Sequence, residues 1–154
     1  MKKVLFIAAL ALLGFSNVNA QEKGDFSGFA GLTYPLTSGA DLGINVGVEY
    51  LFTDVIAVAP SFSYYFTEDV TSTVINIDGR YYLGGDESLK YFGLAGISFS
   101  SVKFEGFSVS DTGINVGGGL IYGLSENLGL IAQLKYGSVG AGALEPMVGV
   151  NFNF

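Results

Sequence analysis

The side chains that most often carry chemistry in proteins are scarce in this chain of 154 residues. It contains no histidine and no cysteine. A Ser-His-Asp triad or a Cys-His dyad therefore cannot form, and the usual zinc ligands are missing. The remaining candidates for acid–base chemistry are two adjacent carboxylate pairs, Glu68-Asp69 and Asp86-Glu87. Both fall in expected connections and are interpreted as solvated loop charges, so we predict no enzyme, no cofactor and no metal.

Five other charged residues fall on the polar side of segments that alternate between polar and apolar residues. They are Glu49, Asp78, Arg80, Lys135 and Glu145. A charge that faces the interior of a protein must be paired or hydrated, because burying it alone is very costly. We expect an ion-pair network that plugs the interior. Lys135 is expected to pair with Glu145, and Arg80 with Asp78 and with Glu49. The alternative is the selectivity filter of a pore.

Strands must position these charges, because the alternation has a period of two. In 43–52, apolar residues such as Ile44 and Val46 take every second position, and Asn45 and Glu49 lie between them. Eight segments are predicted as strands on this basis: 26–34, 43–52, 55–66, 73–83, 89–100, 113–124, 128–136 and 144–154. Pro60 and Pro146 lack an N–H group. We therefore expect a bulge or a local break at Pro60, and we place Pro146 at the outer rim.

The connections between these segments alternate in length. The links at 53–54, 84–88 and 125–127 are tight, and those at 35–41, 67–72, 101–111 and 137–143 are longer. Outer-membrane barrels have short turns on the periplasmic side and longer loops outside. The alternation in length therefore indicates an up-and-down barrel with both termini in the periplasm.

Residues 1–20 have the pattern of a cleaved secretory signal peptide: two lysines, an apolar run of Val4–Phe15, and small residues ending at Ala20. The rest of the chain, 21–154, is expected to form one domain. Its fourteen acidic residues outnumber the basic ones, which disfavours nucleic-acid binding. Only 14% of the residues are charged, yet no later apolar run is long enough for a membrane-spanning helix. A closed barrel is the other structure that spans a membrane.

Alternation alone does not say which face points inward, and a soluble lipocalin-like barrel that binds an apolar ligand is an alternative. The polar face is built mainly from Gly, Ala, Ser and Asn, which suits a narrow lumen. Aromatic residues also gather at both ends of the predicted strands, as in the girdles at lipid interfaces. The girdle tyrosines are Tyr34, Tyr64 and Tyr136 at the outer level and Tyr50, Tyr81 and Tyr122 at the periplasmic level.

The signal peptide, the alternating strands and the ending Val148-x-Val150-x-Phe152-x-Phe154 resemble the small outer-membrane barrels related to OmpX and to the membrane domain of OmpA. The phrases "NIDGRYYL" (76–83) and "YFGLAGISFS" (91–100) resemble the outer-membrane β-barrel domain common in Bacteroidota. The resemblance implies an eight-stranded antiparallel transmembrane barrel in the outer membrane, in contact with its lipids. It also implies that periplasmic chaperones and the barrel-assembly machinery handle the chain, the latter through this C-terminal signal.

The phrase GINVG occurs twice, at 43–47 and at 113–117. In an eight-stranded barrel these copies are the second and sixth strands, so Asn45 and Asn115 face the lumen from opposite walls. Independent use of residue types that are common in such strands explains the repeat at least as well as duplication. We expect a non-enzymatic, monomeric barrel with a structural, envelope-integrity or surface-interaction role. The alternatives are a narrow porin-like channel for small solutes or ions and the soluble binder.

Overall fold

Eight strands make up the computed structural model, which describes residues 23–68, 70–85, 88–105 and 107–154. Their bounds are β1 Phe26–Thr33, β2 Gly43–Leu51, β3 Ile56–Tyr65, β4 Thr71–Gly85, β5 Leu89–Phe104, β6 Phe107–Gly123, β7 Leu128–Gly137 and β8 Ala143–Asn153. The predicted signal peptide of 1–20 lies outside the described residues, as do Asp69, Asp86 and Glu87 of the two carboxylate pairs.

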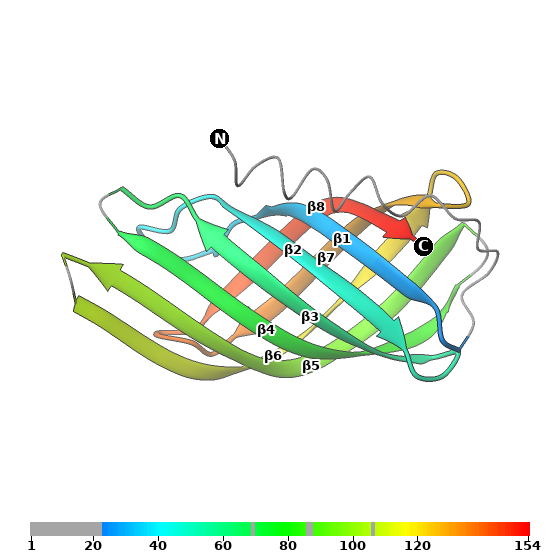
Figure 1. The fold of residues 1–154 in the computed structure, drawn as a ribbon, viewed down its shortest axis with the longest axis horizontal. Helices are drawn as coiled ribbons and strands as arrows, with labels where there is room; N and C mark the ends of the chain where they lie inside the picture. Colours follow the sequence, from blue (N-terminus) through cyan, green and yellow to red (C-terminus); the bar gives the residue numbers. More distant parts are fainter. Residues whose placement is uncertain (1–22, 69, 86–87, 106) are drawn as a thin grey trace.

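The strands close into a barrel in chain order (Figure 1). Each pairs antiparallel with the next, and β1 pairs with β8 in a continuous ladder from Ser27↔Asn153 to Thr33↔Met147. The predicted eight-stranded antiparallel up-and-down barrel is thus confirmed. A sheet closed on itself satisfies its backbone hydrogen bonds internally. In the described part of the chain, no helix has the length and apolarity needed to cross a membrane.

Burial along the strands shows which face points inward. In β3, Ala57 and Ser63 are buried, whereas Ile56 and Phe62 are more than two-fifths exposed. Successive side chains of a strand point to opposite faces of the sheet, so one face of every strand lines the interior. That face carries most of the charged strand residues, and the outward face carries most of the large apolar residues. The barrel is therefore polar inside and apolar outside.

The two ends of the barrel differ in their connections. At one end, which we call the turn end, tight turns join β2 to β3 and β6 to β7, and β1 begins and β8 ends there. At the other end, which we call the loop end, β1 is joined to β2 by residues 34–42 and β7 to β8 by residues 138–142. The predicted alternation of tight and longer connections holds at three of the four longer links.

The prediction of a fourth longer link, a loop over 101–111, is wrong. There β5 continues to Phe104 and β6 begins at Phe107, and Val102 pairs with Val109. The pairing of β6 with β7 starts only at Asn115↔Gly137, so the β5–β6 hairpin projects beyond the rest of the loop end (Figure 1, left). Polar and apolar residues still alternate through this segment. The apolar residues change from the outward to the inward face, and for this reason the sequence does not indicate a continuous strand.

On the projecting hairpin, the apolar side chains point to the same side as the lumen-facing side chains nearer the turn end. The polar side chains point to the same side as the outward-facing ones. The apolar set is Val102, Phe104, Phe107 and Val109, and the polar set is Ser101, Lys103, Ser108 and Ser110. Phe107 and Val109 are 78% and 69% exposed. The outward apolar surface of the barrel therefore ends near Phe99 on β5.

The two prolines inside strands lie where their missing N–H groups are tolerated. The β2–β3 pairing is interrupted at Val48 and Glu49, opposite Ala59 and Pro60, and resumes in the same register. Of the two expected outcomes, a local break without a bulge is the one observed. Pro146 lies at the loop end of β8, and its carbonyl accepts a hydrogen bond from the backbone of Tyr34, just beyond β1.

Candidate functional site in the barrel interior

All five predicted interior charges point into the barrel. They are Glu49 of β2, Asp78 and Arg80 of β4, Lys135 of β7 and Glu145 of β8. The first four are buried, with exposed fractions of 4% or less, and the side chain of Glu145 keeps 14%. Their common orientation follows from strand parity, because each lies an even number of residues from other lumen-facing positions of its strand.

Arg80 contacts side chains from four other strands. Its Nη1 lies 2.9 Å from Oε2 of Glu49, and its Nη2 donates a hydrogen bond of 3.1 Å to Oε1 of Gln133. The guanidinium carbon lies 4.5 Å from the ring centre of Phe29 and 4.6 Å from that of Phe92. A planar guanidinium can accept aromatic rings on its faces while its edge pairs with a carboxylate. The structure therefore contains the expected pair of Arg80 with Glu49.

Apolar side chains surround this ion pair and fill the turn end of the lumen. Tyr82 donates a hydrogen bond of 2.7 Å to the second carboxylate oxygen of Glu49. Together, Arg80, Glu49, Tyr82, Phe29 and Phe92 form what we call the Arg80 cluster. The buried apolar residues around it are Leu51, Ala57, Ala59, Leu94, Ile121, Ile131 and Met147. A buried ion pair in such surroundings depends on both partners, because removing one leaves an uncompensated charge.

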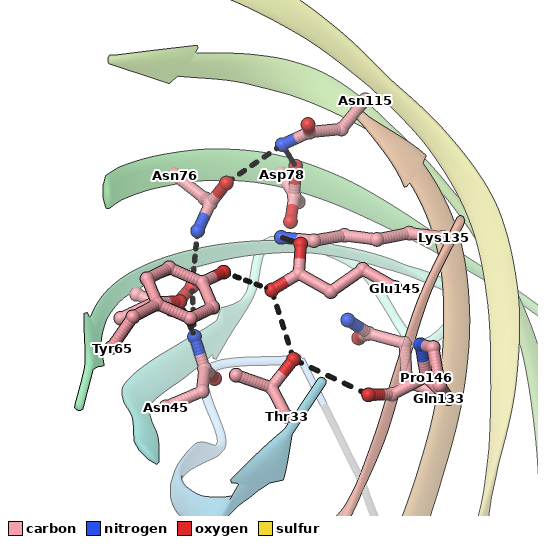
Figure 2. A network of polar contacts seen from close by, with 12 residues as sticks. Thr33, Asn45, Tyr65, Asn76, Asp78, Asn115, Gln133, Lys135, Glu145 and Pro146 are labelled. Carbon is pink, nitrogen blue, oxygen red and sulfur yellow. Dashed lines mark hydrogen bonds and ion pairs between the residues drawn. The ribbon is translucent and has the colours of Figure 1, made fainter. Parts of the chain in front are cut away.

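Lys135 and Glu145 face each other nearer the loop end. They are directly opposite in the β7–β8 register, and Nζ lies 3.8 Å from Oε2. Oε1 of Glu145 accepts a hydrogen bond of 2.8 Å from the Thr33 hydroxyl and a second one from the Tyr65 hydroxyl (Figure 2). Groups from β1, β3 and β7 thus converge on one carboxylate of β8.

Asp78 does not pair with Arg80, so that part of the predicted network is wrong. In the described part of the chain, Asp78 forms no ion pair. Its Oδ1 instead accepts a hydrogen bond of 2.9 Å from the Asn115 side chain. Residues two apart share a face but are separated by about 6.6 Å along a strand, and the guanidinium of Arg80 extends to Glu49 and the two phenylalanine rings. The charges therefore form two separate pairs and one lone carboxylate.

Asparagine and serine side chains line the lumen between the loop end and the Arg80 cluster (Figure 2). Asn115 donates to Asn76 Oδ1 at 3.0 Å, and Asn45 donates to the hydroxyl groups of Ser63 at 2.8 Å and Ser61 at 3.3 Å. Both asparagines of the repeated GINVG phrase therefore form lumen hydrogen bonds. These contacts link β2, β3, β4 and β6 through neutral groups.

Comparison with known proteins shows a similarity of fold alone. No family model and no curated protein matches the chain. Among solved structures, the N-terminal β-barrel domain of OprF from Pseudomonas aeruginosa is 22% identical with a TM-score of 0.73, covering 86% of this chain and 98% of that domain. OprG, an outer-membrane protein of the same organism, is 15% identical with a TM-score of 0.70, covering 90% and 99%. Ail, the attachment invasion locus protein of Yersinia pestis, is 20% identical with a TM-score of 0.58, covering 86% and 99%.

The chain has the fold of the small outer-membrane barrels. At these identities the likeness establishes the fold, and the role has to be argued from the residues themselves. The predicted resemblance to barrels of this size and topology is thus confirmed at the level of shape.

The aromatic residues of the outer surface lie toward the two ends of the strands, the arrangement found in small outer-membrane barrels. Of the six predicted girdle tyrosines, Tyr34, Tyr50, Tyr81, Tyr122 and Tyr136 are exposed and Tyr64 is partly buried. In β8, Val148 is exposed, whereas Val150 and Phe152 are partly buried. Phe154 follows the strand, and its ring centre lies 5.7 Å from that of Phe26.

The aromatic residues that face the lumen of this barrel are absent from the sequence-based predictions. Tyr65 and Tyr82 each follow an outward-facing tyrosine, so parity with Ser63 and Arg80 is a signal that they point inward. Phe29 and Phe92 lie in the segments 26–34 and 89–100, where glycine residues obscure the alternation and the sequence contains no clear signal. Among the described residues, no three His, Cys, Asp or Glu side chains lie close enough to hold a metal ion.

Proposed function

We propose that this chain is an integral, non-enzymatic barrel of the outer membrane with a structural, envelope-integrity or surface-interaction role. The observation that carries the proposal is the polarity of the wall. Large apolar side chains such as Ile114 and Val148 are more than three-fifths exposed on the outer surface, while Glu49 and Arg80 are buried inside. Such a surface is unstable in water and suits hydrocarbon, and a closed barrel leaves no edge strand there.

The soluble, ligand-binding barrel is the weaker alternative for the same reason. A lipocalin-like binder turns its apolar face inward and holds its ligand there. In this chain the inward face carries the charged and amide side chains. The space nearest the turn end is filled by the Arg80 cluster and its apolar neighbours, so the described residues enclose no apolar chamber for such a ligand at that end of the lumen.

The narrow channel is the second alternative, and the lumen geometry also argues against it. An eight-stranded barrel has an interior just wide enough for its side chains. Here the Arg80 cluster spans the interior from β1, β2, β4 and β5. We expect the refolded protein to form no stable open channels in planar bilayers. Stable single-channel current steps would favour the channel function over the structural role.

The projecting β5–β6 hairpin supports the surface-interaction part of the proposal. It extends beyond the other connections and exposes Phe107 and Val109 to solvent. Isolated exposed apolar residues are common, but two adjacent cross-strand apolar pairs on one projecting hairpin form a larger patch. A surface-interaction role would use such a projection, and the name of Ail, one of the similar barrels, refers to attachment and invasion.

Biogenesis partners follow from the same proposal. Periplasmic chaperones would hold the unfolded chain, whose strands expose apolar side chains until the barrel closes. The barrel-assembly machinery would then read Val148, Val150, Phe152 and Phe154 at the end of β8. Because β8 also forms the seam with β1, recognition of this strand would precede closure. The barrel would function as a monomer surrounded by outer-membrane lipids.

Cell fractionation tests the proposed location. Export should remove residues 1–20, and the mature chain should be recovered with the outer membrane as a band whose gel mobility changes on heating. Recovery from the soluble periplasm would sink the proposal.

A charge placed on the outward face tests the lipid contact directly. Val46→Arg should lower the free energy of unfolding in lipid by about 2–4 kcal/mol, because it would place a cation near the middle of the bilayer. Ser110→Arg is a matched control on the outward face of the projecting hairpin, and it should change stability by less than about 0.5 kcal/mol. Equal effects of the two substitutions would contradict the assignment of the outer surface to lipid.

A further inference from the structure

A cavity of about 330 Å³ opens at the loop end of the barrel, above the Arg80 cluster. Its floor is formed by lumen residues of five strands: Tyr65, Asn76, Ser98, Asn115 and Glu145. Its walls are formed by the links at 34–42 and 138–142, by Thr67 and Val70 between β3 and β4, and by the neighbouring strand ends. A volume of this size is within the range of small-molecule sites.

The Ser98 hydroxyl is an unused polar group on the floor of this cavity. Ser98 is 1% exposed, and its Oγ has no hydrogen-bond partner among the described residues. Buried hydroxyl groups almost always have a partner, because an unpaired one has lost its hydrogen bonds to water without replacement. This hydroxyl is therefore available to a molecule that enters the cavity.

Glu145 supplies a second available group. Its Oε1 accepts the hydrogen bonds of Thr33 and Tyr65. Its Oε2 lies 3.8 Å from Lys135 Nζ, which exceeds a hydrogen-bond distance. Oε2 therefore keeps lone pairs for another donor, and the partial exposure of Glu145 on the cavity floor leaves it accessible.

The charges around the cavity favour a cation. Lys135 pairs with Glu145. Asp78, which accepts a hydrogen bond from Asn115 of the floor, has no ion-pair partner among the described residues, and Asp41 adds a third acidic group to the wall. Among the described residues no lysine or arginine lines the cavity. A buried negative charge without a counterion is unfavourable, so a positively charged ligand would complete the balance.

Apart from Thr37, Thr67 and Ser72, the rest of the wall is apolar or glycine. Val70, Val74, Val102 and Val139 face the cavity, together with Pro35. A hydrated inorganic ion gains nothing from such side chains, whereas the hydrocarbon part of an organic ligand can pack against them.

From this combination we propose that the loop-end cavity binds a small organic cation. Its ammonium group donates a hydrogen bond to Glu145 Oε2, its hydrocarbon part packs against the valines, and the Ser98 hydroxyl is the second polar contact. The cavity is closed below by the Arg80 cluster, so the ligand enters and leaves through the loop end. The site is a receptor pocket and not a passage.

Binding of n-butylammonium to the full barrel in phospholipid nanodiscs tests the proposal. Backbone amide signals around the cavity, followed by NMR, should shift and saturate with n-butylammonium. The matched anion n-butyrate and the neutral n-butanol should leave them unchanged. Similar shifts with butyrate or butanol would overturn the proposal. Saturation by Na⁺, K⁺ or Ca²⁺ that blocks n-butylammonium would overturn the organic part of it.

Variants locate the binding groups. Glu145→Gln should weaken binding about tenfold or more, because a hydrogen bond to a charged group is lost. Ser98→Ala should weaken it several-fold, and Asp78→Asn should weaken it without any direct contact by removing excess negative charge. Ser27→Ala is the matched control, because Ser27 has a buried, unpartnered hydroxyl at the turn end. Its binding should equal that of the wild type. Unchanged affinity in both Glu145→Gln and Ser98→Ala, with folded spectra, would refute the site.

Discussion

The loop-end half and the turn-end half of the lumen are lined by the same eight strands but are packed in different ways. In the loop-end half, Asn45, Asn76 and Asn115 form hydrogen bonds between neutral groups below an open cavity. In the turn-end half, Arg80 lies between two phenylalanine rings and is held by Glu49. The difference is one of side-chain size: short polar residues leave space at one end, and aromatic and long aliphatic residues remove it at the other. Strands with the same alternating pattern thus leave a cavity at the loop end and a closely packed lumen at the turn end.

The largest effect is expected from Arg80→Ala in the turn-end half. The substitution would leave Glu49 buried without its counterion, and we expect a loss of about 3–5 kcal/mol in the free energy of unfolding. Urea titration of the barrel in lipid, followed by circular dichroism, measures it. Arg80→Lys is the control for charge, and it should recover only part of the loss because an ammonium group cannot hold the same contacts. A loss below about 1 kcal/mol for Arg80→Ala would erase the contrast between the two halves.

A smaller effect is expected from Lys135→Ala in the loop-end half. Glu145 would lose a partner at 3.8 Å but keep the hydrogen bonds from Thr33 and Tyr65 beside an open cavity. We expect a loss of about 1–2 kcal/mol, between the values for exposed and for buried ion pairs. The same urea titration compares it with Arg80→Ala. A loss equal to that of Arg80→Ala would mean that the loop-end half is as dry as the turn-end half.

The smallest effect is expected from Asn115→Ala. The change removes neutral donors to Asn76 and Asp78 at the floor of the cavity, and water from the cavity can replace them. We expect a loss of about 1 kcal/mol. Asn45→Ala, at the matching position of the other GINVG phrase, should behave similarly. A loss above about 3 kcal/mol would show that this polar layer is a rigid part of the fold.

The contrast between the halves also shows which features a sequence of this kind can predict. Strand parity determines which side chains face the lumen, and a symmetric β7–β8 hairpin requires Lys135 to lie opposite Glu145, as the register confirms. Parity does not determine how far a long side chain extends along the barrel, and the predicted pairing of Arg80 with Asp78 is wrong for that reason. The rings of Phe29 and Phe92, which seal the turn end, lie in glycine-rich strands whose period is weak.

The wrong prediction of a loop at the projecting hairpin has a different physical origin. In 101–110 the period of two is intact, but the apolar residues change from the outward to the inward face between Phe99 and Val102. Prediction of a strand with one continuous apolar face therefore fails at the point where the strand would leave the proposed bilayer. The loss of the pattern marks a boundary of the environment and not an end of the strand.

The change of the outward face of β5 from apolar to polar has a consequence in the proposed bilayer: it determines how deeply the barrel lies in the membrane. On the outward face of β5, Phe99 is followed two residues later by Ser101 and then by Lys103, a change that occurs over about 7 Å along the strand. Sinking by one residue pair would carry serine and lysine into hydrocarbon, and rising by one would expose phenylalanine to water. The barrel is therefore anchored at a fixed height, and a bilayer of different thickness would have to deform around it.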